Sequence, residues 1–221
     1  MKKFYLEDCS VRATMMKKVK GSFYMNKSKI TGILLAGGES RRFGSPKAFA
    51  KLHHKFFYEY AVEALKGNVR KLVIVSHPAL VEQFQNQTSV EVIQDLPEYK
   101  GNGPLAGMFT AMQKEPSDWY VVLPCDTPFV TDELVKQLIT YTNDQNIDAI
   151  VPVINDRQQP LIAVYHGRVA MRIEELLNVQ QFKMSHLLDA CSVKFVTNQE
   201  LHLQGMEFEN INDKTEYQKL L

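Results

Sequence analysis

The feature that most restricts how this chain can fold is a short apolar run followed at once by a glycine-rich, basic loop. The run Ile33–Leu35 is typical of a buried strand. The loop after it carries three glycines and three cations, namely Gly37, Gly38, Gly44, Arg41, Arg42 and Lys47. Glycines directly after a strand let backbone N–H groups approach an anion closely, because no Cβ intervenes. The pattern therefore predicts a phosphate-binding loop rather than an ordinary solvated turn.

The loop is neither of the two common phosphate-binding loops. A Walker A loop ends in Gly-Lys followed by Ser or Thr, and here Ala48 follows Lys47. A dinucleotide-binding fingerprint needs Gly-x-Gly-x-x-Gly, which Gly37, Gly38 and Gly44 do not fit. The sequence therefore indicates a phosphate-binding protein of a different class.

Composition limits the chain to a few classes of protein. Its 221 residues, 45 % hydrophobic and 23 % charged, are typical of a globular α/β domain with a sizeable core. The net charge of +1 does not favour nucleic acid as a partner, and no apolar run is long enough to span a membrane. The cysteines, Cys9, Cys125 and Cys191, are far apart, which favours neither disulfides nor a zinc site and fits a cytoplasmic protein. We expect Cys125 to be a packed residue rather than a nucleophile.

Strand and helix patterns alternate through the first two-thirds of the chain. After the first strand, further strands are expected at residues 71–76, 90–93 and 119–123. Helices are expected between them at residues 56–65 and 80–84 and from residue 104 onward. This alternation predicts an α/β fold with a doubly wound, mostly parallel, Rossmann-like sheet.

The later part of the chain adds a smaller antiparallel element. Residues 148–153 and 161–165 read as two strands joined by a short turn, which favours antiparallel pairing. Residues 1–28 are basic, have no regular apolar period and are expected to form a poorly ordered extension. We therefore predict a single domain over residues 29–221.

Two aspartates follow predicted strands, at the edge where parallel sheets bind ligands. Asp126 is suited to hold Mg²⁺, a hard ion that takes oxygen ligands, although a turn or capping role would explain its position as well. Asp95 can accept hydrogen bonds from a base or a ribose, and its alternative role is to close a turn. Arg42 and Lys47 could stabilise the negative charge that develops during phosphate chemistry.

The run from Leu35 to Lys47 resembles the signature loop of nucleotidyltransferases that attach a nucleoside monophosphate to a phosphorylated acceptor. It is most similar to the loop of the molybdenum cofactor guanylyltransferase family. The turn Gly103–Gly107 resembles that family's Gly-Pro-Leu-Ala-Gly turn, and Phe208–Asn212 resembles its Phe-x-Asn-x-Asn motif. The similarity covers nearly everything after Lys29, with the motifs in the same order, and it implies a nucleotidyltransferase fold.

This resemblance assigns roles to particular residues. It implies that the nucleotide is bound by Leu35, Ala36, Gly37, Gly38, Lys47, Asp95, Gly107 and Asp126. It implies that Arg42, Lys47 and Asp126 are catalytic and that Asp126 is the Mg²⁺ ligand. Asn210 and Asn212 stand at the acceptor side. The chain departs from the family at Ser76-His77, where the family has an asparagine, so the resemblance does not supply that nucleotide contact.

The implied activity is transfer of GMP from GTP to the terminal phosphate of molybdenum-molybdopterin, giving molybdopterin guanine dinucleotide and pyrophosphate. Mg²⁺ would be the cofactor, and molybdenum cofactor insertion proteins and target molybdoenzymes would be transient partners. Two alternatives stay open. One is a cytidylyltransferase, although related enzymes of that kind tend to read Leu-Ala-Ala-Gly where this chain has Leu35-Ala36-Gly37-Gly38. The other is a nucleotide-binding module without catalysis.

Overall fold

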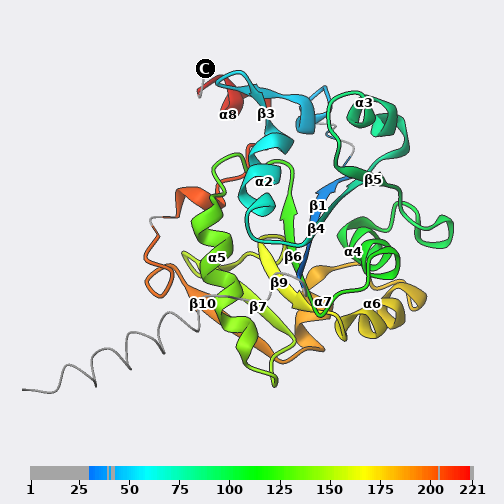
Figure 1. Cartoon of the computed structure of the whole chain (residues 1–221), viewed down its shortest axis with the longest axis vertical. Helices are drawn as coiled ribbons and strands as arrows, with labels where there is room; N and C mark the ends of the chain where they lie inside the picture. The colour runs from blue at the N-terminus through cyan, green and yellow to red at the C-terminus, as the bar shows by residue number, and fades with distance from the viewer. Residues whose placement is uncertain (1–29, 39, 41–42, 204, 220–221) are drawn as a thin grey trace, which may run out of the picture.

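The computed structural model describes residues 30–38, 40, 43–203 and 205–219, so the predicted extension over residues 1–28 lies outside the described residues. The strands of the central sheet are β1 Ile30–Ala36, β4 Lys71–Ser76, β5 Glu91–Ile93, β6 Trp119–Pro124, β7 Ala149–Ile154, β8 Arg157–Gln158, β9 Ala163–His166 and β10 Val193–Thr197. Their order across the sheet is β10-β7-β9-β6-β1-β4-β5, with β8 paired to β7 (Figure 1).

Most of the sheet is parallel, as the sequence predicted. The strands β5, β4, β1 and β6 all run in one direction, and β10 runs parallel to β7. The strand β9 is antiparallel to both of its neighbours, β6 and β7. The expected antiparallel pair β7–β9 is therefore present, and β9 lies inside the sheet, between β6 and β7.

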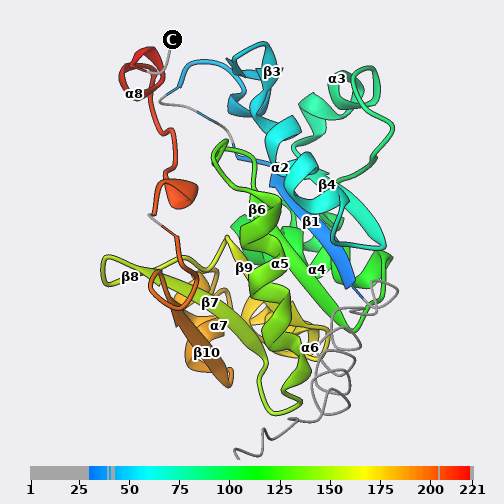
Figure 2. The ribbon, with the colours of Figure 1, turned by 60° about the vertical axis from the view of Figure 1, so that its left-hand side comes forward.

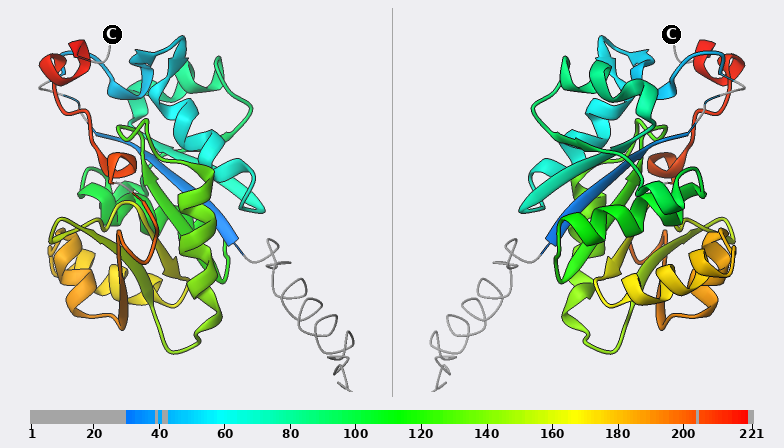
Figure 3. Two further views of the ribbon diagram at one scale, coloured as in Figure 1. Left: turned by 90° about the vertical axis from the view of Figure 1, so that its left-hand side faces the viewer. Right: turned by 90° about the vertical axis from the view of Figure 1, so that its right-hand side faces the viewer.

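Helices cover both faces of this sheet (Figure 3). The α-helices are α2 Phe57–Lys66, α3 Val81–Gln85, α4 Gly103–Lys114, α5 Asp132–Thr140, α6 Val169–Asn178, α7 Met184–Asp189 and α8 Lys214–Gln218. The 3₁₀ helices are η2 Lys47–Phe49, η3 Pro78–Leu80, η4 Pro97–Tyr99, η5 Tyr141–Asn143 and η6 Met206–Phe208. No helix among the described residues combines the length and the hydropathy needed to cross a membrane.

Alternating side chains of each strand explain why two helical layers form. Leu34 packs in one apolar cluster with α2 and α5, whereas its neighbour Ile33 packs in a second cluster with α4, α6 and α7. Ile74 and Val73 of β4 divide between the two clusters in the same way. Because successive strand side chains point to opposite faces, a continuous apolar strand needs cover on both sides.

The path of the chain creates a switch point beside β1. From β1 the chain passes through α2 to β4 and then on to β5, after which α4 returns it to β6 on the other side of β1. In such sheets, ligands bind where connections leave in opposite directions from the carboxyl ends of adjacent strands. The carboxyl ends of β4, β1 and β6 are therefore the place to look for a site.

Two short hairpins were not expected from the sequence. The strands β2 Lys51–Leu52 and β3 Lys55–Phe56 pair through His53 and His54, which have φ of 46° and 74°. The predicted turn after β7 also contains β8, with Asn155 and Asp156 at φ of 49° and 59°. Positive φ at two successive residues suits the right-handed twist of a tight hairpin.

The ion pair of Asp148 and Arg168 links the chain segments next to β7, β9 and β10, on the side of the sheet away from β5. Asp148 is buried ahead of β7, accepts a hydrogen bond from the Ser192 N–H at 2.8 Å and pairs with Arg168 at the start of α6. Burial by itself raises the pKa of the Asp148 carboxyl, but the Ser192 N–H and the Arg168 guanidinium outweigh it and lower that pKa below its ordinary value of 3.8.

We expect Asp148→Ala to lower the free energy of unfolding at neutral pH by about 2 kcal/mol, because two hydrogen bonds to a charged group are lost. The contribution of Asp148 is fully present above its unfolded pKa and is lost as pH falls through the lower pKa of the folded state. Urea unfolding at several pH values measures both effects. The exposed Glu174, changed to Gln, serves as the control. The prediction would be contradicted if the difference in the free energy of unfolding between wild type and Asp148→Ala stayed constant down to pH 2.

Candidate functional site

A cavity of about 460 Å³ opens at the carboxyl ends of β1, β4 and β6. Every residue predicted to bind the nucleotide lines it, namely Leu35, Ala36, Gly37, Gly38, Lys47, Asp95, Gly107 and Asp126. Arg42, predicted to be catalytic, lies outside the described residues. The structure thus brings the predicted nucleotide-binding residues together around one cavity, at the switch point of the sheet.

The loop after β1 is shaped by Ser40. Its hydroxyl accepts a hydrogen bond from the backbone N–H of Lys47 at 3.1 Å, and its carbonyl accepts one from the N–H of Phe43 at 2.9 Å. A Cβ at Gly37 would lie 3.8 Å from the backbone nitrogen of His77, and a Cβ at Gly38 would contact nothing within 4 Å. Ser40 therefore fixes the position of Lys47, where η2 begins. Because Gly37 and Gly38 have no side chains, their backbone is accessible from the cavity.

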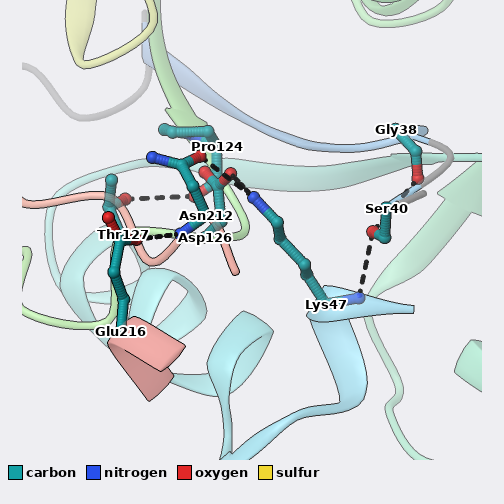
Figure 4. Close-up of polar contacts among 8 residues, drawn as sticks. All are labelled: Gly38, Ser40, Lys47, Pro124, Asp126, Thr127, Asn212 and Glu216. Atoms are coloured by element: carbon teal, nitrogen blue, oxygen red, sulfur yellow. Dashed lines mark hydrogen bonds and ion pairs between the residues drawn. The ribbon is translucent and has the colours of Figure 1, made fainter. Parts of the chain in front are cut away.

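Lys47 and Asp126 form the charged end of the cavity (Figure 4). The Lys47 ammonium lies 3.0 Å from Oδ2 of Asp126 and 3.2 Å from Oδ1 of Asn212. The two charged side chains are 12 % and 23 % exposed, so their charges are only partly screened by water. A cation and a carboxylate held this close to an open glycine loop can bind a phosphate and its counterion.

Backbone hydrogen bonds hold Asp126 at the end of β6. The N–H of Cys125 donates to the carbonyl of Leu35 at 3.0 Å, which extends the pairing of β6 with β1 as far as the site. The N–H of Ile211 donates to the carbonyl of Asp126 at 3.0 Å. The Asp126 backbone is therefore anchored from a neighbouring strand and from the C-terminal segment.

A magnesium ion suits this set of side chains better than a transition metal does. Among the described residues, no three His, Cys, Asp or Glu side chains gather as a metal-binding group. Zinc sites need three or four protein ligands, whereas Mg²⁺ is commonly held by one or two carboxylates, with water and substrate phosphates as its other ligands. Asp126 alone fits the second case.

Asp95 follows β5 and lines the cavity beside Gly107 of α4. One of its carboxylate oxygens accepts a hydrogen bond from the Gly101 N–H at 3.3 Å. Burial raises the pKa of the Asp95 carboxyl above its ordinary value, while the Gly101 N–H and His77 act in the opposite direction. A ligand that donates N–H groups to this half-buried carboxylate would offset the cost of its burial.

Gly107 lets α4 contact the ends of β1 and β4 beside Asp95. A Cβ at Gly107 would lie 2.9 Å from Cδ2 of Leu35, 3.3 Å from Cγ1 of Val75 and 3.7 Å from Oδ1 of Asp95. A larger residue at position 107 would therefore have to displace the side chains of Leu35 and Val75, which also line the cavity. A nucleotide-binding role for Gly107 stays a prediction, and what the structure shows is close packing at this position.

The cavity also contains residues that were not assigned to the site from the sequence. They include Ser40, Val75, Pro78, Leu80, Lys100, Pro124 and Leu161, together with His77, which stands at the family's asparagine position. Nδ1 of His77 accepts a hydrogen bond from the N–H of Ala79 at 3.2 Å, so in the neutral ring the proton sits on Nε2. Lys100 is a lone exposed cation in a turn, which no spacing in the sequence would have indicated.

The two asparagines predicted at the acceptor side differ in their surroundings. Asn212 touches the site through Lys47, and its backbone N–H donates to Oε2 of Glu216 at 2.6 Å. Asn210 is exposed and does not line the cavity. The structure thus places Asn212, but not Asn210, in contact with a residue of the cavity.

Cys125 adjoins Asp126 but has the properties of an inert thiol. Burial, with the Asp126 carboxylate as a further cause, raises the pKa of the Cys125 thiol to about 12. Because only the thiolate is a strong nucleophile, this environment disfavours covalent chemistry at Cys125. The preference for a packed residue at this position agrees with the structure.

Comparison with known proteins identifies the family. Residues 32–196 match the family model of the MobA-like NTP transferase domain. A probable molybdenum cofactor guanylyltransferase of Geobacillus sp. (strain WCH70) is 42 % identical over 194 residues, which cover 88 % of this chain and 99 % of the relative. A protein of the same name from Bacillus cereus (strain B4264) is 43 % identical over 190 residues, covering 86 % and 94 %.

The fold agrees with these matches. The crystal structure of molybdopterin-guanine dinucleotide biosynthesis protein A from Archaeoglobus fulgidus is similar with a TM-score of 0.75 at 25 % identity, over 86 % of this chain and 96 % of that one. The family predicted from the motifs is thereby confirmed. This chain belongs to the MobA-like NTP transferase family.

Proposed function

We propose that this protein transfers GMP from GTP to the terminal phosphate of molybdenum-molybdopterin, releasing pyrophosphate. The observation that carries the proposal is the ion pair of Lys47 and Asp126, 3.0 Å apart, at one end of a cavity lined by the glycines after β1. The relatives named molybdenum cofactor guanylyltransferase match over nearly their whole length, which supports the choice of guanine nucleotide and acceptor.

The charged end of the cavity would bind the phosphates. The Lys47 ammonium is placed to contact phosphate oxygens and to neutralise the charge they gain when the acceptor phosphate attacks the α-phosphorus. Asp126 would hold Mg²⁺, which supplies further positive charge to the phosphates when bound. Arg42 remains a predicted catalytic residue in the same loop. The protein's part in this reaction is to position and stabilise, which needs no protein nucleophile.

The part of the cavity that Asp95 lines would bind the base. The Asp95 carboxylate can accept hydrogen bonds from the ring N–H groups of guanine or from a ribose hydroxyl. Asn210 and Asn212 would face the molybdopterin side. The protein would act in the cytoplasm, with transient contacts to molybdenum cofactor insertion proteins and target molybdoenzymes.

A pyrophosphate-release assay with GTP, Mg²⁺ and molybdenum-molybdopterin tests the activity directly. We expect release to require all three components and to be at least tenfold slower with CTP, because cytosine lacks the ring N–H that Asp95 would bind. Equal rates with CTP would favour a cytidylyltransferase. Binding of GTP without any release of pyrophosphate would favour a non-catalytic module.

The role of Asp126 can be tested by substitution. We expect Asp126→Ala to lower turnover by at least about a hundredfold, since charge stabilisation of this kind contributes on that scale. Its melting temperature should fall by only a few degrees, because the Lys47 ammonium keeps Asn212 as an acceptor and the backbone hydrogen bonds of Asp126 persist. The exposed Asp189, changed to Asn, is the control. Near-normal turnover of Asp126→Ala at saturating Mg²⁺ would remove the metal-ligand assignment.

Direct transfer also predicts that Cys125 is dispensable. We expect Cys125→Ser to retain turnover within about threefold of wild type, since a thiol whose pKa is near 12 is almost wholly protonated at pH 8. In the folded protein, iodoacetamide should label Cys125 far more slowly than in urea, as peptide mass spectrometry can measure. Rapid labelling in the folded state together with loss of turnover in the variant would indicate a covalent mechanism instead.

A further inference from the structure

The C-terminal segment returns to the charged end of the cavity. The family model ends at residue 196, yet Ile211 and Asn212 contact the residues that carry the proposed chemistry. The helix α8 that follows is joined to β2 by the hydrogen bond from the Tyr217 hydroxyl to the Lys51 carbonyl. Figures 1 and 2 show α8 at the same end of the molecule as the hairpin β2–β3. Residues 209–219 are called the C-terminal segment below.

Hydrogen bonds run from α8 to the ion pair (Figure 4). Oε2 of Glu216 accepts the backbone N–H of Asn212 at 2.6 Å. Oδ1 of Asn212 accepts a hydrogen bond from the Lys47 ammonium at 3.2 Å. The same ammonium donates to Oδ2 of Asp126 at 3.0 Å. Glu216 and Asn212 are therefore linked in series, through the Lys47 ammonium 165 residues away from Asn212, to the carboxylate of Asp126.

The segment is packed firmly enough to serve as a support. Ile211 is 3 % exposed and packs in one apolar cluster with Phe43, Leu52 and Phe57. The hydroxyl of Tyr217 donates to the carbonyl of Lys51 at 2.6 Å. The side chain of Asn212 is thus attached to a backbone held in place on both sides, by an apolar contact before it and by α8 after it.

We propose that Glu216 is a positioning residue that acts through Asn212 to hold the Lys47 ammonium at the phosphate-binding end of the cavity. Lysine has a long, flexible side chain, and fixing it before the substrate arrives reduces the entropy lost on binding. Glu216 fixes the backbone of Asn212, Asn212 offers one acceptor, and Asp126 offers the second. The proposal rests on the proposed function, in which Lys47 contacts the phosphates of GTP.

A purely structural role makes a different prediction. Glu216 lies in the first turn of α8, where its N–H donates to the Asp213 carboxylate at 2.9 Å. If Glu216 only stabilised this helix, its removal would weaken folding by the same amount whether or not Lys47 were present. If it acts on Lys47, its effect on GTP should disappear when the ammonium is removed.

A double-mutant cycle in the full chain separates the two roles. GTP affinity in Mg²⁺ is measured by calorimetry, and kcat and KM by pyrophosphate release, for Glu216→Ala, Asn212→Ala and Lys47→Met and for their pairs. Glu216→Gln is the conservative variant, because its amide oxygen can still accept the Asn212 N–H. Tyr217→Phe is the control, since it loses the hydrogen bond of α8 to Lys51 and leaves Asn212 untouched.

We expect Glu216→Ala and Asn212→Ala each to lower both kcat and GTP affinity about fivefold, because Lys47 must then be ordered when the nucleotide binds. The double variant should be no worse than either single variant, and Glu216→Gln should recover most of the activity. In the Lys47→Met background, Glu216→Ala should change GTP affinity by less than about twofold, as expected for coupled residues. Tyr217→Phe should stay near wild type.

The positioning role would be overturned if Glu216→Ala lowered GTP affinity by the same factor with and without the Lys47 ammonium. It would also be overturned if Tyr217→Phe lowered kcat and GTP affinity as much as Glu216→Ala does. These outcomes leave the proposed function intact, because it depends on the wild-type assay. A wild type that binds GTP but releases no pyrophosphate would overturn only the proposed function, since the affinity cycle still decides the role of Glu216. A wild type that does not bind GTP would overturn both.

Discussion

The ion pair between Lys47 and Asp126 is the interaction on which the arrangement of the site depends. Its partners come from the loop after β1 and from the end of β6, 79 residues apart. Both side chains are mostly shielded from water, where an unpaired charge is costly. Each charge therefore stabilises the other in this structure, and the proposed function has phosphate oxygens and a metal ion take over these roles.

The fold supplies the conditions for that pair. The strands β1 and β6 are neighbours, and the hydrogen bond from Cys125 to Leu35 continues their pairing up to the cavity. The glycine at position 107 lets α4 approach the ends of β1 and β4 closely, so that Asp95 and the residues after β1 line the same cavity. The site is thus a product of strand order and of close packing at one glycine.

Much of this could be predicted from the sequence, for identifiable reasons. The strands β1, β4 and β6 are continuous apolar runs, and the residues after them had to lie at one edge of a parallel sheet. The hairpin at His53 and His54 could not be predicted, because neither residue favours positive φ as Asn-Gly does. The contact of Asn212 with Lys47 spans 165 residues, and no local pattern encodes such a distance.

That last contact has a consequence for how the protein is made. A chain emerging from the ribosome can form β1, α2 and β4 early, because their contacts are close in sequence. The lysine after β1 meets all its acceptors only when residues 212 to 216 have emerged as well. A nascent chain that has not yet reached residue 216 could therefore fold its sheet while Lys47 still lacks Asn212 as an acceptor, so that synthesis of this late segment, rather than folding of the sheet, completes the site.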